Sequence, residues 1–254
     1  WIGAAGGATI LAPSRGWAES GALKTPDSLD IDSFLSSGGV AQPMGVSGQA
    51  GKSRPETGVV LRDGSEVDRD SRTGDVLAEI IVDSSSGKVP ILASYSSPWP
   101  LAKGTVFDVE CRDASTGDGA FLQVSSNVGG KSIEQLKDSF FLDQLLAPTG
   151  RFSFYGPPTD VKILKSSLEG DYRTIDLKFS TVSQATQTEI PRRARLTATI
   201  PEGSAQAVML IASSSSLRWK KGSEKAIAST IESFRAFPAP STSLSVRGKE
   251  RGRP

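Results

Sequence analysis

The chain has 254 residues, 37% of them hydrophobic, and its 29 basic and 28 acidic side chains leave a formal net charge of +1. This near-balance gives no indication of a nucleic-acid surface, which needs a strong positive excess, and the composition predicts one packed domain of about 150–170 residues with extended arms. Because the chain contains no histidine and one cysteine, histidine-dependent hydrolysis, histidine-based zinc sites and internal disulfides are excluded.

Residues 1–18 form an apolar, weakly charged segment. The first 13 residues carry no charge and are rich in small side chains, and Arg15 and Trp17 precede a candidate cleavage point near Ala18. This pattern indicates the end of an export signal whose basic part is missing, and an apolar arm that packs on a partner is the alternative. No apolar run reaches the ~20 residues of a membrane-spanning helix, so we expect no membrane span.

Residues 19–75 show little regular periodicity and are first glycine-rich, then densely charged. Such a segment buries too little apolar area to offset backbone ordering, which costs about 1–2 kcal/mol per residue. We therefore expect an extended arm that becomes ordered only against another protein. Its apolar and basic side chains are the candidate contacts with that partner: Met44, Val46, Lys52, Arg54, Val59, Val60, Leu61 and Arg62.

Acidic side chains alternate near the end of this arm, at Glu66, Asp68 and Asp70, a pattern that suggests calcium. A calcium loop of the EF-hand type that begins at Glu66 needs glycine at its sixth position and glutamate at its twelfth, where the chain has Ser71 and Leu77. Basic side chains also lie among the acids. We expect a solvated loop of ion pairs and no cofactor, with a calcium site as the alternative.

From residue 76 the chain changes to short apolar runs, many of them alternating with polar residues, which is typical of β-strands. Eight strands are predicted, over residues 76–82, 89–95, 105–111, 120–128, 161–168, 171–181, 193–200 and 206–213. Short turns join the first strand to the second and, around Gly170, the fifth to the sixth, so each pair predicts a hairpin. The pattern predicts an α+β fold in which helices flank a central antiparallel β-sheet.

Two helices are predicted among these strands. The first begins at Ser132, where Gln135 completes a capping-box pattern, and Pro148 ends it. The second follows a basic turn at residues 218–222, and Pro238 ends it. Three apolar residues of the second helix are spaced so that one stripe must be buried: Ile227, Ile231 and Phe234.

Several single residues have clear structural interpretations. The alternation around Cys111 places its thiol on the apolar face of a strand, which predicts a buried and inert group. Trp99 follows a strand between two prolines and is interpreted as a plug at one end of the core, with an exposed recognition residue as the alternative. Trp219 has basic neighbours and is expected to be half buried. Residues 116–119 most simply form a turn.

The remaining segments suggest no catalysis. Lysine-activated serine chemistry needs a serine three residues before a lysine at the start of a helix, and the chain offers no such arrangement, so no catalytic residue is predicted.

The tail, residues 239–254, is polar and basic. We expect it to be solvated, and electrostatic contact with an acidic surface is the alternative.

Four segments occur in a fixed order along residues 76–238. They are Tyr95–Pro100, the helix from Ser132 to Leu146, the strand from Arg173 to Ser180 and, most specific, Arg218-Trp219-Lys220-Lys221-Gly222 with Lys225 and the closing Ser233-Phe234. This series resembles the PsbP family, lumenal proteins of oxygenic photosynthesis. The resemblance implies an α/β/α sandwich, with a central antiparallel sheet covered by helices on both faces.

The resemblance also implies a location and a function. PsbP-like proteins are soluble proteins of the plastid thylakoid lumen, attached from outside to a photosystem or a related membrane complex. The best-known member supports water oxidation at photosystem II by helping to retain calcium and chloride. The long arm and the lack of histidine depart from that member, and the chain looks more like the divergent PsbP-domain proteins.

The expected function is therefore a non-catalytic lumenal subunit or assembly factor that docks on photosystem subunits through its extended arm. Lys220 and Lys221, in the basic turn, are further candidate contacts. An ion-binding accessory module that supports water oxidation is the alternative.

Overall fold

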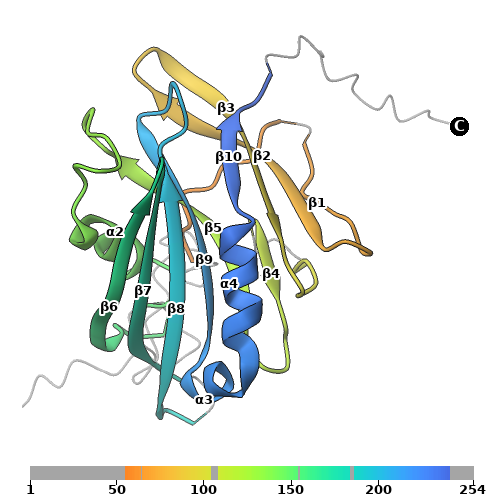
Figure 1. The fold of residues 1–254 in the computed structure, drawn as a ribbon, viewed down its shortest axis with the longest axis vertical. Coiled ribbons are helices and arrows are strands. Elements are labelled where there is room, and N and C mark those ends of the chain that lie inside the picture. The colour runs from red at the N-terminus through yellow and green to blue at the C-terminus, as the bar shows by residue number, and fades with distance from the viewer. Residues whose placement is uncertain (1–54, 64, 104–107, 154, 184–185, 241–254) are drawn as a thin grey trace, which may run out of the picture. The chain divides into compact units, whose positions relative to one another are not determined.

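Figure 1 shows the computed structural model, which describes residues 55–63, 65–103, 108–153, 155–183 and 186–240. Buried and exposed side chains alternate along many of its strands, as a strand with one face toward a core requires. In β2 (Asp75–Ser84), every second side chain from Val76 to Val82 is buried. The strands form a small and a large sheet, and all neighbouring strands are antiparallel.

The small sheet has the strand order β1-β2-β3-β10, and the large sheet has the order β4-β5-β9-β8-β7-β6. Besides β2, the small sheet contains β1 (Asp68–Arg69), β3 (Gly87–Ser96) and β10 (Arg235–Pro238). The large sheet contains β4 (Glu110–Arg112), β5 (Gly119–Asn127), β6 (Thr159–Glu169), β7 (Tyr172–Val182), β8 (Glu189–Thr199) and β9 (Gln206–Ser215). The α-helices of the described residues are α2 (Asp138–Leu145), α3 (Ser216–Arg218) and α4 (Glu224–Glu232), and a π-helical turn, Trp219–Ser223, joins α3 to α4.

Two hydrophobic cores lie on opposite faces of the large sheet. The first lies between the two sheets and beneath α4, which packs against β3, β8 and β9. The second lies on the other face, where Phe141 and Leu145 of α2 pack with side chains of β7 and β8. The stripe predicted for the C-terminal helix is confirmed, since Ile227, Ile231 and Phe234 are all buried in the first core.

β9 is apolar on both faces because both cores contact it. Val208 and Leu210 belong to the first core, whereas Met209 and Ile211 belong to the second. A strand buried on both faces reads as a continuous apolar run, which accounts for the sequence of residues 206–213.

Seven of the eight predicted strands occur with their ends shifted by a few residues. The exception is the strand predicted at 105–111, of which only Glu110 and Cys111 lie in β4, because the chain bends at Asp108 and Val109 and residues 104–107 lie outside the described part. The hairpin turn at Gly170 is confirmed.

The first predicted helix is wrong at its start. Residues 133–136 form a turn and a bend, and α2 begins only at Asp138. The guanidinium of Arg173 donates hydrogen bonds to the carbonyls of Ile133 (3.3 Å) and Glu134 (3.2 Å). Those carbonyls would otherwise accept the first bonds of the helix. Gln135 still makes half of the predicted capping box, since its side chain accepts from the amide of Ser132 at 3.0 Å.

The second predicted helix ends earlier than Pro238. α4 stops at Glu232, and β10 carries the chain back along β3. The hydroxyl of Ser233 donates to the carbonyl of Thr230 (2.7 Å) and accepts from the amide of Ser96 in β3 (2.8 Å), which ties the helix end to the small sheet. Pro238 is tolerated in this strand because β10 lies at the edge of its sheet.

Residues 55–75 pack on the body of the chain. The amide of Val124 in β5 donates to the carbonyl of Thr57, and the amide of Ile81 in β2 donates to the carbonyl of Val60, both at 2.8 Å. β1 then pairs with the other end of β2. The segment thus passes from an edge of the large sheet to an edge of the small sheet.

The prediction that the whole of residues 19–75 becomes ordered only against a partner needs correcting for residues 55–75. Val59 is buried in the first core and Leu61 packs against it. Although the segment is rich in charged residues, burial of these two side chains stabilises it against the body of the chain. Its backbone carbonyls at Thr57 and Val60 are also hydrogen-bonded to β5 and β2.

The prediction of antiparallel β-sheet is confirmed, and the described residues form an α+β or mostly-β fold with short helices. The layers differ from an α/β/α sandwich, because one face of the large sheet is covered by both the small sheet and α4 and not by helices alone. Among the described residues, no helix has the length and apolar character needed to cross a membrane.

Candidate functional site

The predicted arm contacts have different positions in the structure. Val59 is buried and Leu61 is partly buried, so neither offers its side chain to a partner, whereas Val60 is 54% exposed. Arg62 forms an ion pair with Glu79 of β2, with 3.4 Å between nitrogen and oxygen. Four more predicted contacts lie outside the described residues: Met44, Val46, Lys52 and Arg54.

Val60 and Arg62 adjoin an apolar surface of the small sheet. Leu92 of β3 lies between Glu79 of β2 and Phe237 of β10 in the strand register. Facing residues of a sheet point to the same side, so these side chains share the surface directed away from the first core. We call this surface the outer face; it comprises Val60, Arg62, Leu77, Glu79, Ile81, Pro90, Leu92, Arg235 and Phe237.

Three large apolar side chains of the outer face are open to solvent. Leu77 and Phe237 are each 45% exposed, and Val60 more so. Grouped exposed apolar side chains on a sheet are a feature of protein interaction surfaces, whereas scattered ones need no explanation. The sequence analysis pointed to Val60 and Arg62 but not to Leu77, although a strand was predicted there. It missed Phe237 because β10 was interpreted as the end of a helix.

The acidic residues proposed for calcium are not gathered into a site. Glu66 and Asp68 are exposed, and Oδ1 of Asp70 accepts hydrogen bonds from the amides of Arg72 (2.7 Å) and Thr73 (3.3 Å) in its own turn. Within the described part of the chain, no three acidic, histidine or cysteine side chains cluster as metal ligands would. The structure therefore gives the calcium alternative no support.

The basic turn holds a deeply buried tryptophan. Trp219 begins the turn Trp219–Ser223 and is 6% exposed, more buried than predicted, because it packs in the first core. The guanidinium of Arg193 also lies 5.2 Å from its ring centroid. Lys220 and Lys221 are exposed, as a contact with a partner requires. Trp99 is also buried, which confirms the plug interpretation.

Cys111 is fully buried, as predicted. The hydroxyl of Tyr95 donates toward its sulfur at 3.7 Å, and burial raises the pKa of Cys111. The thiol lies in the first core and is a packing group.

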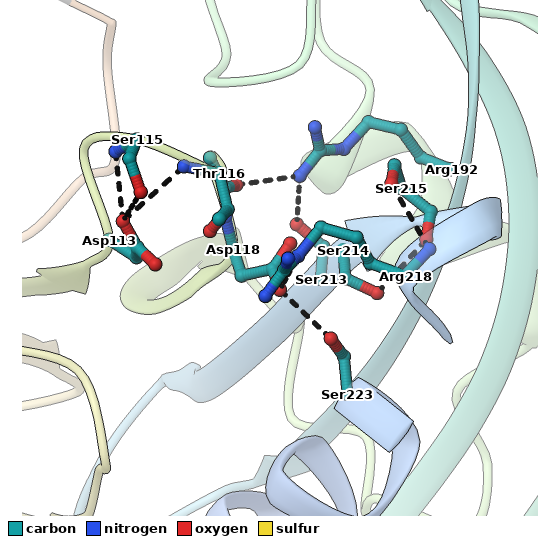
Figure 2. A network of polar contacts seen from close by, with 11 residues as sticks. Asp113, Ser115, Thr116, Asp118, Arg192, Ser213, Ser214, Ser215, Arg218 and Ser223 are labelled. Carbon is teal, nitrogen blue, oxygen red and sulfur yellow. Dashed lines mark hydrogen bonds and ion pairs between the residues drawn. The ribbon is translucent and has the colours of Figure 1, made fainter. Parts of the chain in front are cut away.

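Asp118 organises a polar network at one end of the large sheet (Figure 2). This side chain is 1% exposed and accepts hydrogen bonds on Oδ2 from Nε of Arg218 (2.7 Å) and from the hydroxyl of Ser223 (2.9 Å). The bond to the carboxylate raises the pKa of Arg218. The network therefore fixes the basic turn to the loop between β4 and β5.

That loop is itself closed by a second carboxylate. Oδ1 of Asp113 accepts hydrogen bonds from the hydroxyl and the amide of Ser115 and from the amide of Thr116 (Figure 2). The bond from the Ser115 hydroxyl is the main reason that the pKa of Asp113 falls to about 2. A turn between strands is thus present as predicted, but it lies at residues 114–116, earlier than the predicted 116–119, and Gly119 already begins β5. No local pattern indicated that Asp118 would be buried and bound to another element.

Arg192 of β8 reaches the same loop. Its Nη2 donates to the carbonyl of Gly117 and to the hydroxyl of Ser213, both at 3.0 Å (Figure 2). Burial lowers the pKa of Arg192, and the nearby charge of Asp118 opposes that effect.

A scan of the chain against protein-family models finds no match, and a search of curated proteins finds no relative.

Proposed function

We propose that this chain is a non-catalytic accessory protein that docks on a photosynthetic membrane complex through the outer face. The observation that carries the proposal is the group of half-exposed apolar side chains on the small sheet, beside the Arg62–Glu79 ion pair. A surface with an apolar centre and a polar margin is the usual composition of a protein interface.

The choice of a photosynthetic partner rests on the series of segments that resembles the PsbP family. What supports it is the role of the most specific segment, Arg218–Gly222, in the fold. Its tryptophan is buried, its arginine is bound to Asp118, and its lysines remain exposed. We infer a PsbP-like sandwich and a peripheral position at the thylakoid membrane, on the lumenal side.

The outer face and the basic turn then have separate roles in docking. The outer face provides apolar contact area, and the exposed Lys220 and Lys221 provide positive charge that steers the approach to an acidic partner surface. Residues 38–54 lie outside the described part, and their contact with the partner stays a prediction.

Binding of the full chain to thylakoid membranes stripped of peripheral proteins tests the proposal. Leu77→Gln and Phe237→Gln together remove apolar area from the outer face without adding charge. We expect the affinity, measured by co-sedimentation, to fall by at least about tenfold, because central apolar residues contribute most of the binding energy of an interface.

Leu164→Gln and Leu168→Gln are the matched control, since both residues lie on β6 with exposures of 40% and 39%. The control should bind as the unsubstituted chain does, and thermal unfolding should show that both double variants are folded. Equal binding by the two double variants, or no binding by the unsubstituted chain, would contradict the proposal.

A further inference from the structure

A cavity of about 160 Å³ lies beside β4, at the same end of the large sheet as the Asp118 network. It is lined by residues of β4, β5, β7, β8 and β9 and of the loop that follows α2. Its charged wall consists of three arginines and one glutamate: Arg112, Arg151, Arg192 and Glu110. The wall therefore has an excess of positive charge, although the chain as a whole is nearly neutral.

Arg192 is the arginine of this wall whose pKa is lowered by burial. Its Nη2 is bound by Gly117 and Ser213, but its Nε is buried and has no hydrogen-bond acceptor among the described residues. A buried donor without an acceptor costs free energy, and a specific one in a native structure needs an explanation. The positive charges of Arg151 and Arg112 lie near enough to add to the lowering of the pKa of Arg192 that burial causes.

Other side chains of the wall contact two of the arginines. Nη2 of Arg151 donates to Oε1 of Glu110 at 2.9 Å, which orients the guanidinium. The rings of Phe121 and Phe152 meet edge to face at 5.6 Å, and the guanidinium of Arg192 lies 6.0 Å from the Phe152 centroid. Apolar walls lower the local dielectric constant and so strengthen the attraction of an anion to the arginines.

We propose that this cavity binds a small oxyanion of the phosphate or carboxylate class. Guanidinium groups present planar pairs of N–H donors that match the oxygens of such anions. The volume suits an inorganic oxyanion or a short dicarboxylate, since pockets for larger organic ligands measure about 300–1,000 Å³. The bound anion offsets the mutual repulsion of the three arginines. This ligand site does not depend on the outer face or its partner.

Calorimetric titration of the full chain at low ionic strength tests the proposal, with sodium phosphate, sodium sulfate and sodium malonate as probes. We expect saturable binding of at least one probe below about 10 mM. Preference for phosphate and sulfate over malonate indicates a tetrahedral anion as the ligand, and the reverse indicates a carboxylate.

Arg112→Gln should weaken that binding about tenfold or more, since a charge-assisted hydrogen bond is lost. Arg72→Gln, in an exposed turn away from the cavity, makes the same change of charge and should leave the affinity unaltered. Equal affinities of the two variants would overturn the proposal, because the effect would then come from net charge.

A measurement on the unsubstituted chain avoids any dependence on the folding of a variant. The preferred oxyanion should raise the thermal unfolding midpoint above that in sodium chloride of the same ionic strength, since a ligand stabilises the state that it binds. Equal midpoints in all four salts, together with no saturable heat, would overturn the proposal.

Discussion

Asp118 connects segments of the chain that are far apart in sequence. Its partners Arg218 and Ser223 are 100 and 105 residues away. The carboxylate is buried, but the arginine that neutralises it is 44% exposed. This asymmetry matters because an exposed arginine that loses its partner is solvated by water, whereas a buried carboxylate that loses its partner is not.

Substitutions of Arg218 and of Asp118 should therefore lower the stability by different amounts. Arg218→Ala leaves a buried carboxylate with the hydroxyl of Ser223 as its remaining bonded partner on Oδ2, and we expect the thermal unfolding midpoint to fall by several degrees. Asp118→Asn removes the buried charge and keeps the shape, so the fall should be smaller. Lys221→Ala, in the same turn, should leave the midpoint almost unchanged. A larger loss in Asp118→Asn than in Arg218→Ala would contradict this description.

The residue scale also shows what a sequence can and cannot predict. The burial of Cys111 and of Ile227, Ile231 and Phe234 followed from local spacing, because period and parity decide which side of an element faces a core. The role of Asp118 did not, since a turn aspartate looks the same whether it caps its own turn or binds an arginine from another element. The arginine-lined cavity was missed for the same reason.

At the scale of elements, the segment from Pro55 to Arg62 joins the edges of the two sheets. Gly58 makes this crossing feasible, because its backbone has φ +69° and a β-carbon there would lie 2.7 Å from the carbonyl oxygen of Val124. Both the backbone conformation and the close approach favour glycine. Residues 55–62 thus pack tightly on the body of the chain and do not form a free extended arm.

Gly58→Ala tests this fit. We expect it to lower the free energy of unfolding by about 2–5 kcal/mol, from backbone strain and from displacement of β5. Gly129→Ala is the matched control, since Gly129 has φ +65° but no atom within 4 Å of the added methyl group. It should cost about 1–2 kcal/mol from backbone strain alone. Equal losses in chemical denaturation would show that residues 55–62 do not approach β5.

Element boundaries were less predictable than element existence. α2 starts six residues after the predicted Ser132 because Arg173 takes the carbonyls of the first turn. β10 was absent from the prediction because a four-residue edge strand that ends in proline carries little local signal. Both boundaries depend on contacts with distant residues: Arg173 for the start of α2, and pairing with β3 for β10.

At the scale of the whole molecule, the antiparallel α+β architecture was predictable because the alternation of many strands is strong and local. The pairing of the strands into two sheets was not, since the outer face is formed by strands from both ends of the described chain. The same long-range pairing places Phe237 beside Leu92. The docking surface therefore became visible only with the fold.

Docking through the outer face is tested most directly by site-specific photocrosslinking of the full chain to thylakoid membranes. A photoreactive phenylalanine analogue at Phe237 should form an adduct with a subunit of a photosynthetic membrane complex, identified by mass spectrometry, and the same analogue at Leu164 should not. No adduct from position 237, or the same adduct from both positions, would contradict it.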